Sequence, residues 1–190
     1  MSFELIVITA PVILPDEIRQ IVDLFDAGLS TLHVRKPGLT AHAVAGMIEQ
    51  IPEQFHHRLV VHHHDELLQY FKLKGIHGVR KKIASVTRSL SLHHWSECAD
   101  IPSYIDYVLV SPVFDSLSKR GYAGNPLLHQ KPEMPLHYKL IAMGGVTPVN
   151  IEQLLKEKWD GAAILGCIWN DARNAQVQFR AIQNSIKSQI

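Results

Sequence analysis

The sequence predicts one α/β domain folded as a minimal (β/α)8 TIM barrel over residues 1–190. Short apolar runs bounded by turn residues alternate with segments of helical period, which is typical of repeated βα units and a parallel sheet. Eight such runs favour a closed barrel, because an open doubly wound sheet needs fewer strands and usually a glycine-rich turn after the first. A chain of 190 residues that is 46% hydrophobic can bury one sizeable core.

The elements follow in order along the chain. We expect strands at 3–9, 31–34, 59–61, 75–79, 84–90, 107–111, 138–143 and 161–165. Helical periodicity predicts helices at 15–27, 40–50, 65–73, 149–156 and 172–186. Lys81 and Lys82 leave no room for a full helix after the fourth strand. The stretch 112–135 is the longest without helical periodicity, and we expect it to form a loop at the active-site face.

Composition excludes several classes of partner. The 19 basic and 18 acidic residues leave a formal charge of +1, which predicts neither a nucleic-acid nor a membrane footprint. No apolar run is long enough to span a bilayer, and the first residues lack a signal-peptide pattern. Cys98 and Cys167 have no metal or redox spacing. We therefore expect a cytoplasmic protein whose partners are small molecules.

Two glycine turns near the end of the chain indicate a phosphate site. Gly144 and Gly145 follow the seventh predicted strand, and Gly166-Cys167 follows the eighth. Barrels hold phosphate groups on backbone amides after their last two strands, where glycine lets the backbone approach the ligand closely. We predict that both turns bind phosphate oxygens.

Polar residues at the carboxyl ends of the other strands should share the same mouth. Arg35 follows the second strand, and the hydroxyls of Ser91, Ser116 and Ser118 together with Lys119 are expected to give charge-assisted bonds to phosphate. Histidines are frequent there, and His33, His77 and His93 are the candidate general acids or bases, since imidazole titrates near neutral pH.

The histidines also raise a metal hypothesis. His33, His77 and one of the pair His62-His63 could converge as three imidazoles, and only one of that pair can face inward from a regular strand. No cysteine spacing or HExxH motif supports an ion, so we predict no protein-bound metal and assign His62 and His63 to substrate binding.

The chain resembles the thiamine phosphate synthase family and its paralogue, the thiazole tautomerase. Three motifs carry the resemblance in order, at 106–122, 141–150 and 160–163, and weaker similarity continues through 32–35, 75–77 and 89–93. The resemblance implies a barrel, often a homodimer, that joins an aminopyrimidine diphosphate to a thiazole phosphate with help from Mg²⁺. It places the diphosphate on Arg35, Ser91, Ser116, Ser118 and Lys119, and the thiazole phosphate on Gly145 and the Gly166-Cys167 turn.

The pyrimidine and magnesium half departs from the family pattern. His33 replaces a glutamine, Pro37 a lysine and His62-His63 an Asn-Asp pair, while Lys82 falls near an expected aspartate. The remaining candidate carboxylates are Asp65 and Asp115. Because imidazole and ammonium groups are poor substitutes for the oxygens that Mg²⁺ prefers, tautomerase-like proton transfer on a thiazole phosphate is our first interpretation. The alternatives are a synthase with a rearranged metal site, which would still use Mg²⁺, and a non-catalytic protein that binds thiazole phosphate or thiamine phosphate.

Overall fold

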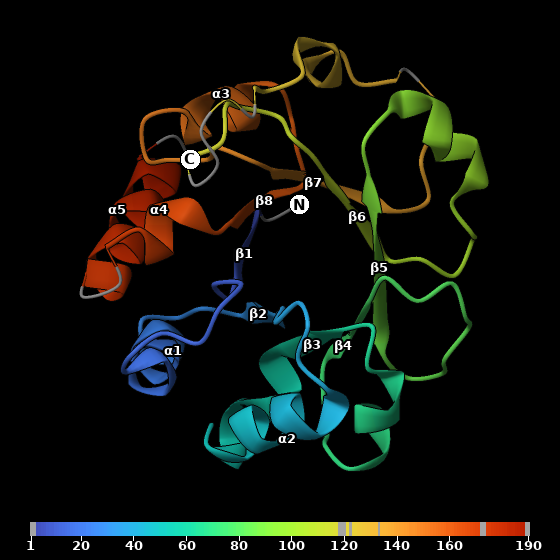
Figure 1. Ribbon diagram of the computed structural model, residues 1–190. Coiled ribbons are helices and arrows are strands. Elements are labelled where there is room, and N and C mark those ends of the chain that lie inside the picture. The colour runs from blue at the N-terminus through green and yellow to red at the C-terminus, as the bar shows by residue number, and fades with distance from the viewer. Residues whose placement is uncertain (1–2, 118–120, 122, 133, 172–173, 189–190) are drawn as a thin grey trace.

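The computed structural model describes residues 3–117, 121, 123–132, 134–171 and 174–188. Eight parallel strands pair in sequence order and close into a barrel, β1 pairing with both β2 and β8 (Figure 1). The predicted (β/α)8 architecture is therefore confirmed. The strands are β1 (Glu4–Ile8), β2 (Thr31–Val34), β3 (Leu59–His62), β4 (Gly75–His77), β5 (Thr87–Leu92), β6 (Tyr107–Val110), β7 (Lys139–Met143) and β8 (Gly161–Ile164).

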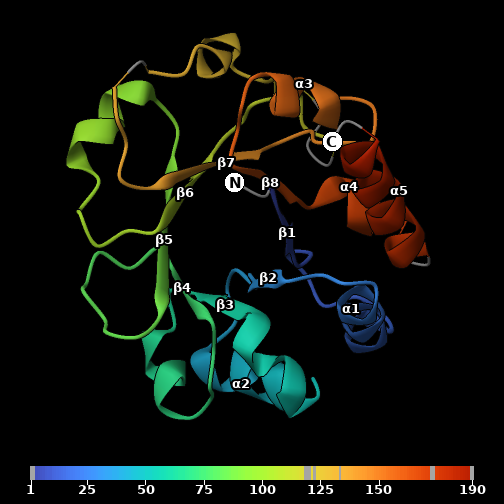
Figure 2. The same cartoon turned by 180° about the vertical axis from the view of Figure 1, so that it is seen from behind.

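Helices cover the outside of the strand ring unevenly (Figure 2). Longer helices lie outside β1, β2 and β8, whereas residues 78–86 between β4 and β5 contain no helix, as the sequence predicted. None of the helices in the described residues is long and apolar enough to cross a membrane. The α-helices are α1 (Glu17–Asp26), α2 (Ala41–Glu49), α3 (Ile151–Lys156), α4 (Gly166–Trp169) and α5 (Ala175–Lys187), and the 3₁₀ helices are η1 (Glu53–Arg58), η2 (Asp65–Gln69), η3 (Trp95–Asp100) and η4 (Pro126–His129).

Three predicted elements differ from the structure. The fifth strand begins at Thr87 instead of residue 84, because Ala84 and Ser85 form a turn with Ser85 at a φ of 62°. Residues 65–73 form only the short 3₁₀ helix η2. The last predicted helix is two helices, since α4 begins directly after β8 at Gly166 and α5 begins at Ala175.

The barrel interior has an apolar half and a polar half. Inward side chains of β1, β6, β7 and β8 form an apolar cluster that includes Ile6, Leu109 and Ile141. The interior of β2 to β5 is polar, because imidazoles and hydroxyls there replace the branched side chains that usually fill a barrel. These polar side chains are as buried as the apolar cluster. Strand register sets this pattern, and it places His62, His77, Ser89 and Tyr107 at matched positions on four consecutive strands.

Charged groups occupy the amino-terminal end of the barrel. Glu4 accepts a bond from Lys139 Nζ at 3.1 Å and lies 3.7 Å from Lys74 Nζ, which also bonds to Thr31. Burial lowers the pKa of Lys74, although Glu4 opposes that effect. The large pocket of the barrel lies at the opposite end.

Candidate functional site

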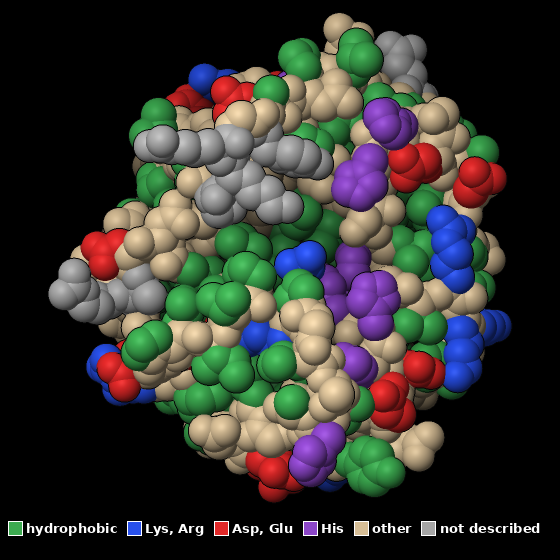
Figure 3. Space-filling model, in the orientation of Figure 1, with side chains coloured by type: hydrophobic (Ala, Val, Ile, Leu, Met, Phe, Trp, Pro, Cys, Tyr) green, Lys and Arg blue, Asp and Glu red, His purple; other side chains and the backbone are tan. Residues whose placement is uncertain are grey.

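A cavity of about 610 Å³ opens at the carboxyl ends of the strands. Figure 3 shows histidine side chains gathered on one side of the central hollow, beside a cationic side chain. Residues from five strand ends and the loop after β6 line the cavity, so it collects groups that are far apart in sequence. The lining residues are Ile8, Pro11, Arg35, Pro37, Ser91, His93, Ser111, Pro112, Ser116, Leu117, Met143, Gly144, Gly145, Val146, Ala163, Leu165 and Gly166.

The turn after β7 is held in a conformation that suits glycine. Gly144 and Gly145 have φ values of 100° and 61°, and a Cβ on Gly145 would lie 2.1 Å from the carbonyl oxygen of Asp115. The Asn150 side chain donates to the Gly145 carbonyl at 2.9 Å and accepts from the Thr147 amide at 2.8 Å. The turn is therefore fixed against the loop after β6 while its backbone faces the cavity.

The turn after β8 contributes Gly166 to the cavity, but Cys167 does not line it. The Cys167 Sγ lies 4.0 Å from Gln178 Oε1 of α5, because α4 begins here and carries the side chain away from the mouth. Burial raises the pKa of this thiol. Of the two predicted residues, the structure places only Gly166 at the site.

Arg35 projects from the end of β2 into the cavity, and its backbone is fixed from both sides. The Arg35 amide donates to Thr9 Oγ1 at 2.9 Å, and the Thr9 hydroxyl donates to the Arg35 carbonyl at 3.0 Å. No described residue bonds to its guanidinium, so the charge is available to an anionic ligand.

The next residue, Lys36, is buried against Glu17 with its Nζ 2.6 Å from Oε1. It also donates to the carbonyls of Ala10 and Val12, at 2.8 Å each. The ion pair therefore joins the end of β2 to α1, and the two carbonyl bonds hold the loop after β1, whose Pro11 lines the cavity. The sequence analysis did not predict a structural role for Lys36. Its place directly after the candidate site residue Arg35 could have indicated one.

Ser91 and His93 bring the end of β5 to the mouth. His93 Nδ1 donates to the carbonyl oxygen of Ser111 at 2.8 Å, so the ring reaches across to the end of β6. That bond leaves Nε2 as the unprotonated nitrogen of the neutral ring. Ser116 also lines the cavity, whereas Ser118 and Lys119 lie outside the described residues.

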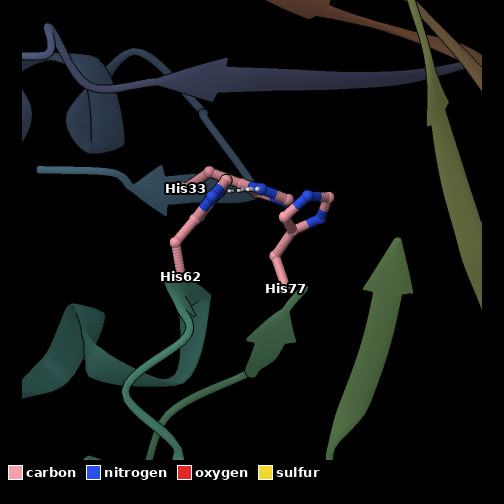
Figure 4. Close-up of side chains that lie close together, drawn as sticks. All are labelled: His33, His62 and His77. Carbon is pink, nitrogen blue, oxygen red and sulfur yellow. Dashed lines mark hydrogen bonds between the residues drawn. The ribbon is translucent and has the colours of Figure 1, made fainter. Parts of the chain in front are cut away.

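The side chains of His33, His62 and His77 come together from β2, β3 and β4 (Figure 4), and none of the three lines the cavity. They are 0%, 9% and 4% exposed, and one ring nitrogen from each lies within 4.8 Å of the others. Burial, followed by neighbouring positive charge, lowers the pKa of all three, that of His77 to about 3. All three rings are therefore neutral at physiological pH.

Hydroxyl groups orient two of these rings. The His33 Nε2 lies 2.6 Å from Tyr107 Oη, and its Nδ1 lies 3.0 Å from His62 Nε2. His77 contacts Ser89 Oγ through Nδ1 at 2.9 Å and Ser91 Oγ through Nε2 at 3.1 Å. Because Ser91 also lines the cavity, it links the buried histidines to the mouth.

Of the adjacent pair, His62 faces the barrel and His63 does not, as strand alternation required. Strand β3 ends at His62, and His63 turns outward with a φ of 65° and is exposed. Its ring lies over Gly78, where a Cβ would be 2.4 Å away. The structure thus places neither His62 nor His63 on the cavity wall, because His62 is buried inside the barrel and His63 turns outward.

Comparison with known proteins identifies the family. A model described as thiamine monophosphate synthase matches residues 5–168. The chain belongs to the thiamine monophosphate synthase family. The fold and the glycine turns after β7 and β8 agree with the resemblance found in the sequence.

Similar proteins within the thiamine monophosphate synthase family come from several bacteria. Thiamine-phosphate synthase 1 of Streptococcus pneumoniae (strain ATCC BAA-255 / R6) is 33% identical over 102 residues, which cover 50% of this chain and 47% of that protein, about half its length. Thiamine-phosphate synthase of Lysinibacillus sphaericus (strain C3-41) is 23% identical over 161 residues, covering 75% of this chain and 76% of that one. The crystal structure of thiamine phosphate pyrophosphorylase from Bacteroides thetaiotaomicron has a TM-score of 0.79, with 26% identity over 99% of this chain and 100% of that one.

The Mg²⁺ that the family resemblance implies does not fit the described residues. No carboxylate is among the groups that line the cavity. Asp65 bonds to Lys81 at 2.8 Å, which lowers its pKa, and Asp115 accepts the Gly124 amide at 2.8 Å. Since Mg²⁺ sites use carboxylate oxygens together with phosphates, we derive no catalytic step through this ion.

Proposed function

We propose that this member of the thiamine monophosphate synthase family joins an aminopyrimidine diphosphate to a thiazole phosphate and releases pyrophosphate. The observation that carries the proposal is one cavity that presents two sets of phosphate-binding groups. Arg35, Ser91 and Ser116 form the first set, and the backbone turns at Gly145 and Gly166 form the second. The similar proteins that bear the name thiamine-phosphate synthase support this transferase activity over tautomerase activity.

The chemistry is a substitution at the methylene carbon of the pyrimidine. The C–O bond to the diphosphate breaks and its electron pair leaves with pyrophosphate, while the thiazole nitrogen supplies the pair for the new C–N bond. Arg35 stabilises the negative charge that develops on the leaving group, and the two serine hydroxyls donate to its oxygens. Glycine-turn amides hold the thiazole phosphate, so that fixed dipoles and positioning provide the catalysis.

A second candidate activity rests on His93. Characterised thiazole tautomerases have their catalytic histidine near the end of the sixth strand, where this chain has Pro112. His93 comes from β5, yet its ring bonds to Ser111 at the end of β6, adjacent to that position. Its unprotonated Nε2 suits removal of a proton from a carboxythiazole phosphate. Of the three candidate acids or bases, only His93 lines the cavity, since His33 and His77 are enclosed.

An NMR time course separates these activities. Purified protein is incubated with carboxythiazole phosphate, and aminopyrimidine diphosphate and Mg²⁺ are added halfway. Thiamine phosphate, pyrophosphate and CO₂ appearing after the addition support the transferase, because the carboxylate of the thiazole leaves as CO₂ when the new C–N bond forms. Conversion of the tautomer before it supports the second candidate, and His93→Gln should then abolish the conversion. No change in either half refutes both activities.

Arg35→Ala tests the assignment of the diphosphate group. Loss of its charge-assisted bonds should weaken binding of inorganic pyrophosphate by about 10-fold to 150-fold, which corresponds to roughly 1.5–3 kcal/mol. The matched control is Arg19→Ala, because the Arg19 side chain on α1 is 68% exposed and outside the cavity. Isothermal titration that gives equal affinities for Arg35→Ala and the wild type would show that the diphosphate binds elsewhere.

A further inference from the structure

Three neutral imidazoles converge inside the barrel from neighbouring strands. His33, His62 and His77 come from β2, β3 and β4, and their closest nitrogens all lie within 4.8 Å (Figure 4). The distance from His33 Nδ1 to His62 Nε2 is 3.0 Å. Tetrahedral Zn²⁺ at about 2.0–2.1 Å from each nitrogen needs nitrogens roughly 3.3 Å apart, so small side-chain rotations would bring the three nitrogens to one ion.

Hydrogen bonds to the other ring nitrogens of His33 and His77 orient these rings toward a shared ion. Ligand histidines usually bond their other nitrogen to a fixed polar group, which sets the tautomer and the direction of the ring. Tyr107 Oη holds His33 Nε2, so that Nδ1 faces His62, and Ser89 Oγ holds His77 Nδ1, so that Nε2, which contacts Ser91 Oγ at 3.1 Å, is the nitrogen that would turn to the ion. Tyr107 and Ser89 are 3% and 1% exposed, so both partners are as buried as the rings they hold.

The donor set determines which ion fits. Neutral imidazole is a good ligand for Zn²⁺, Co²⁺ and related ions, whereas Mg²⁺ prefers oxygen. Three protein ligands leave one position of a tetrahedral ion open, and Ser91, which contacts His77 Nε2 at 3.1 Å, lies between the cluster and the cavity.

We propose that His33, His62 and His77 form a binding site for a divalent transition-metal ion of the Zn²⁺ class, with its open position toward the cavity. This proposal departs from our prediction from the sequence, which assigned no protein-bound metal. Its ligands are imidazole nitrogens, whereas Mg²⁺ sites use carboxylate and phosphate oxygens, so the two kinds of ion require different donors. The competing interpretation is a hydrogen-bonded core, since the described buried side-chain polar atoms all have partners without an ion.

The experiment measures metal binding in the absence of substrates, so its outcome is independent of the reaction proposed above. Protein expressed without a histidine tag is stripped with a chelator and titrated with Zn²⁺ against a chromophoric competitor, with Mg²⁺ as the comparison ion. We expect one tight Zn²⁺ per chain and no competition by Mg²⁺. His62→Ala and His77→Ala should each lose more than about 100-fold in Zn²⁺ affinity, because even an outer contact is worth roughly 10–100-fold.

Two further variants control the measurement. His42→Ala removes an exposed histidine of α2 and should leave the affinity unchanged, which separates the cluster from adventitious surface binding. Tyr107→Phe keeps all three ligands and should lower the affinity by about 10–100-fold. Circular dichroism checks that each variant is folded.

X-ray absorption of the wild-type zinc protein gives a test that needs no variant. Three imidazole nitrogens at about 2.0–2.1 Å support the site. The proposal is overturned if the wild type fails to bind one equivalent of Zn²⁺, if His62→Ala and His77→Ala retain it, or if the bound ion has fewer than three imidazoles. Any of these results assigns the histidines to a hydrogen-bonded core.

Discussion

Lys36→Met tests whether the buried ion pair next to Arg35 maintains the mouth of the barrel. The Lys36 and Glu17 side chains are 0% and 2% exposed, and Nζ lies 2.6 and 2.7 Å from the two carboxylate oxygens. Methionine keeps most of the aliphatic length but removes the charge. The Glu17 carboxylate and the carbonyls of Ala10 and Val12 would then be left without their shared donor.

The magnitude follows from this burial. Removing one partner of a buried pair costs about 3–5 kcal/mol, because the remaining charge stays desolvated and unpaired. For a domain of this size, each kcal/mol lowers the melting temperature by roughly 2–4 °C, so we expect a decrease of about 6–20 °C. Ligand affinity should fall as well, because Pro11 lies between the two released carbonyls and lines the cavity.

A double-mutant cycle in urea measures the coupling between the two residues. Glu17→Gln removes the unpaired charge, so the double variant should be more stable than the sum of the single losses predicts, by about 2 kcal/mol or more. Arg19→Met, which breaks the exposed Asp16–Arg19 pair at 3.8 Å, should change the free energy of unfolding by less than about 1 kcal/mol. If Lys36→Met is as stable as Arg19→Met, or if the cycle is additive, the Lys36–Glu17 pair does not stabilise the mouth of the barrel.

Two other predictions concern the turn after β7 and the acid range. Gly145→Ala should destabilise the protein by about 1–3 kcal/mol and weaken thiazole-phosphate binding, because its Cβ would meet the Asp115 carbonyl at 2.1 Å and its φ is 61°. The control is Gly46→Ala on α2, which should be neutral or stabilising because a Cβ there meets nothing within 4 Å. Equal unfolding curves for the two variants would contradict the close approach at Gly145. Burial raises the pKa of Glu157, but hydrogen bonds to its carboxylate, including that from His129, outweigh burial and lower the pKa. The ionised carboxylate therefore stabilises the fold above the ordinary carboxyl pKa of about 4.3, and this stabilisation is lost as the pH falls through the lowered pKa. Glu157→Gln should therefore lower the melting temperature most near neutral pH, with the gap to wild type closing on acidification, and a gap that stays constant down to about pH 3 would disprove this.

The error in the bounds of the fifth strand has a clear physical cause. The predicted bounds of β5 began too early, because the inward residues Ser89 and Ser91 are polar. Only the outward Leu90 and Leu92 follow the apolar pattern that marks a strand. The convergence of His33, His77 and one of His62 and His63 was expected from the barrel, because each residue stands near the end of a different strand and no local spacing joins them. Whether they bind a metal stays a prediction to be tested.

The barrel, the strand order and the glycine turns could be predicted from the sequence, because alternation of apolar strands with helices and the positions of Gly144 and Gly166 are local patterns. It also determined that one of His62 and His63 faces inward, since adjacent strand residues point to opposite sides. The three-dimensional structure was needed to show that His62, and not His63, joins His33 and His77, and that His93 lines the cavity. Barrel closure and strand register bring side chains from distant segments into one row, and those distances are absent from any local stretch of sequence.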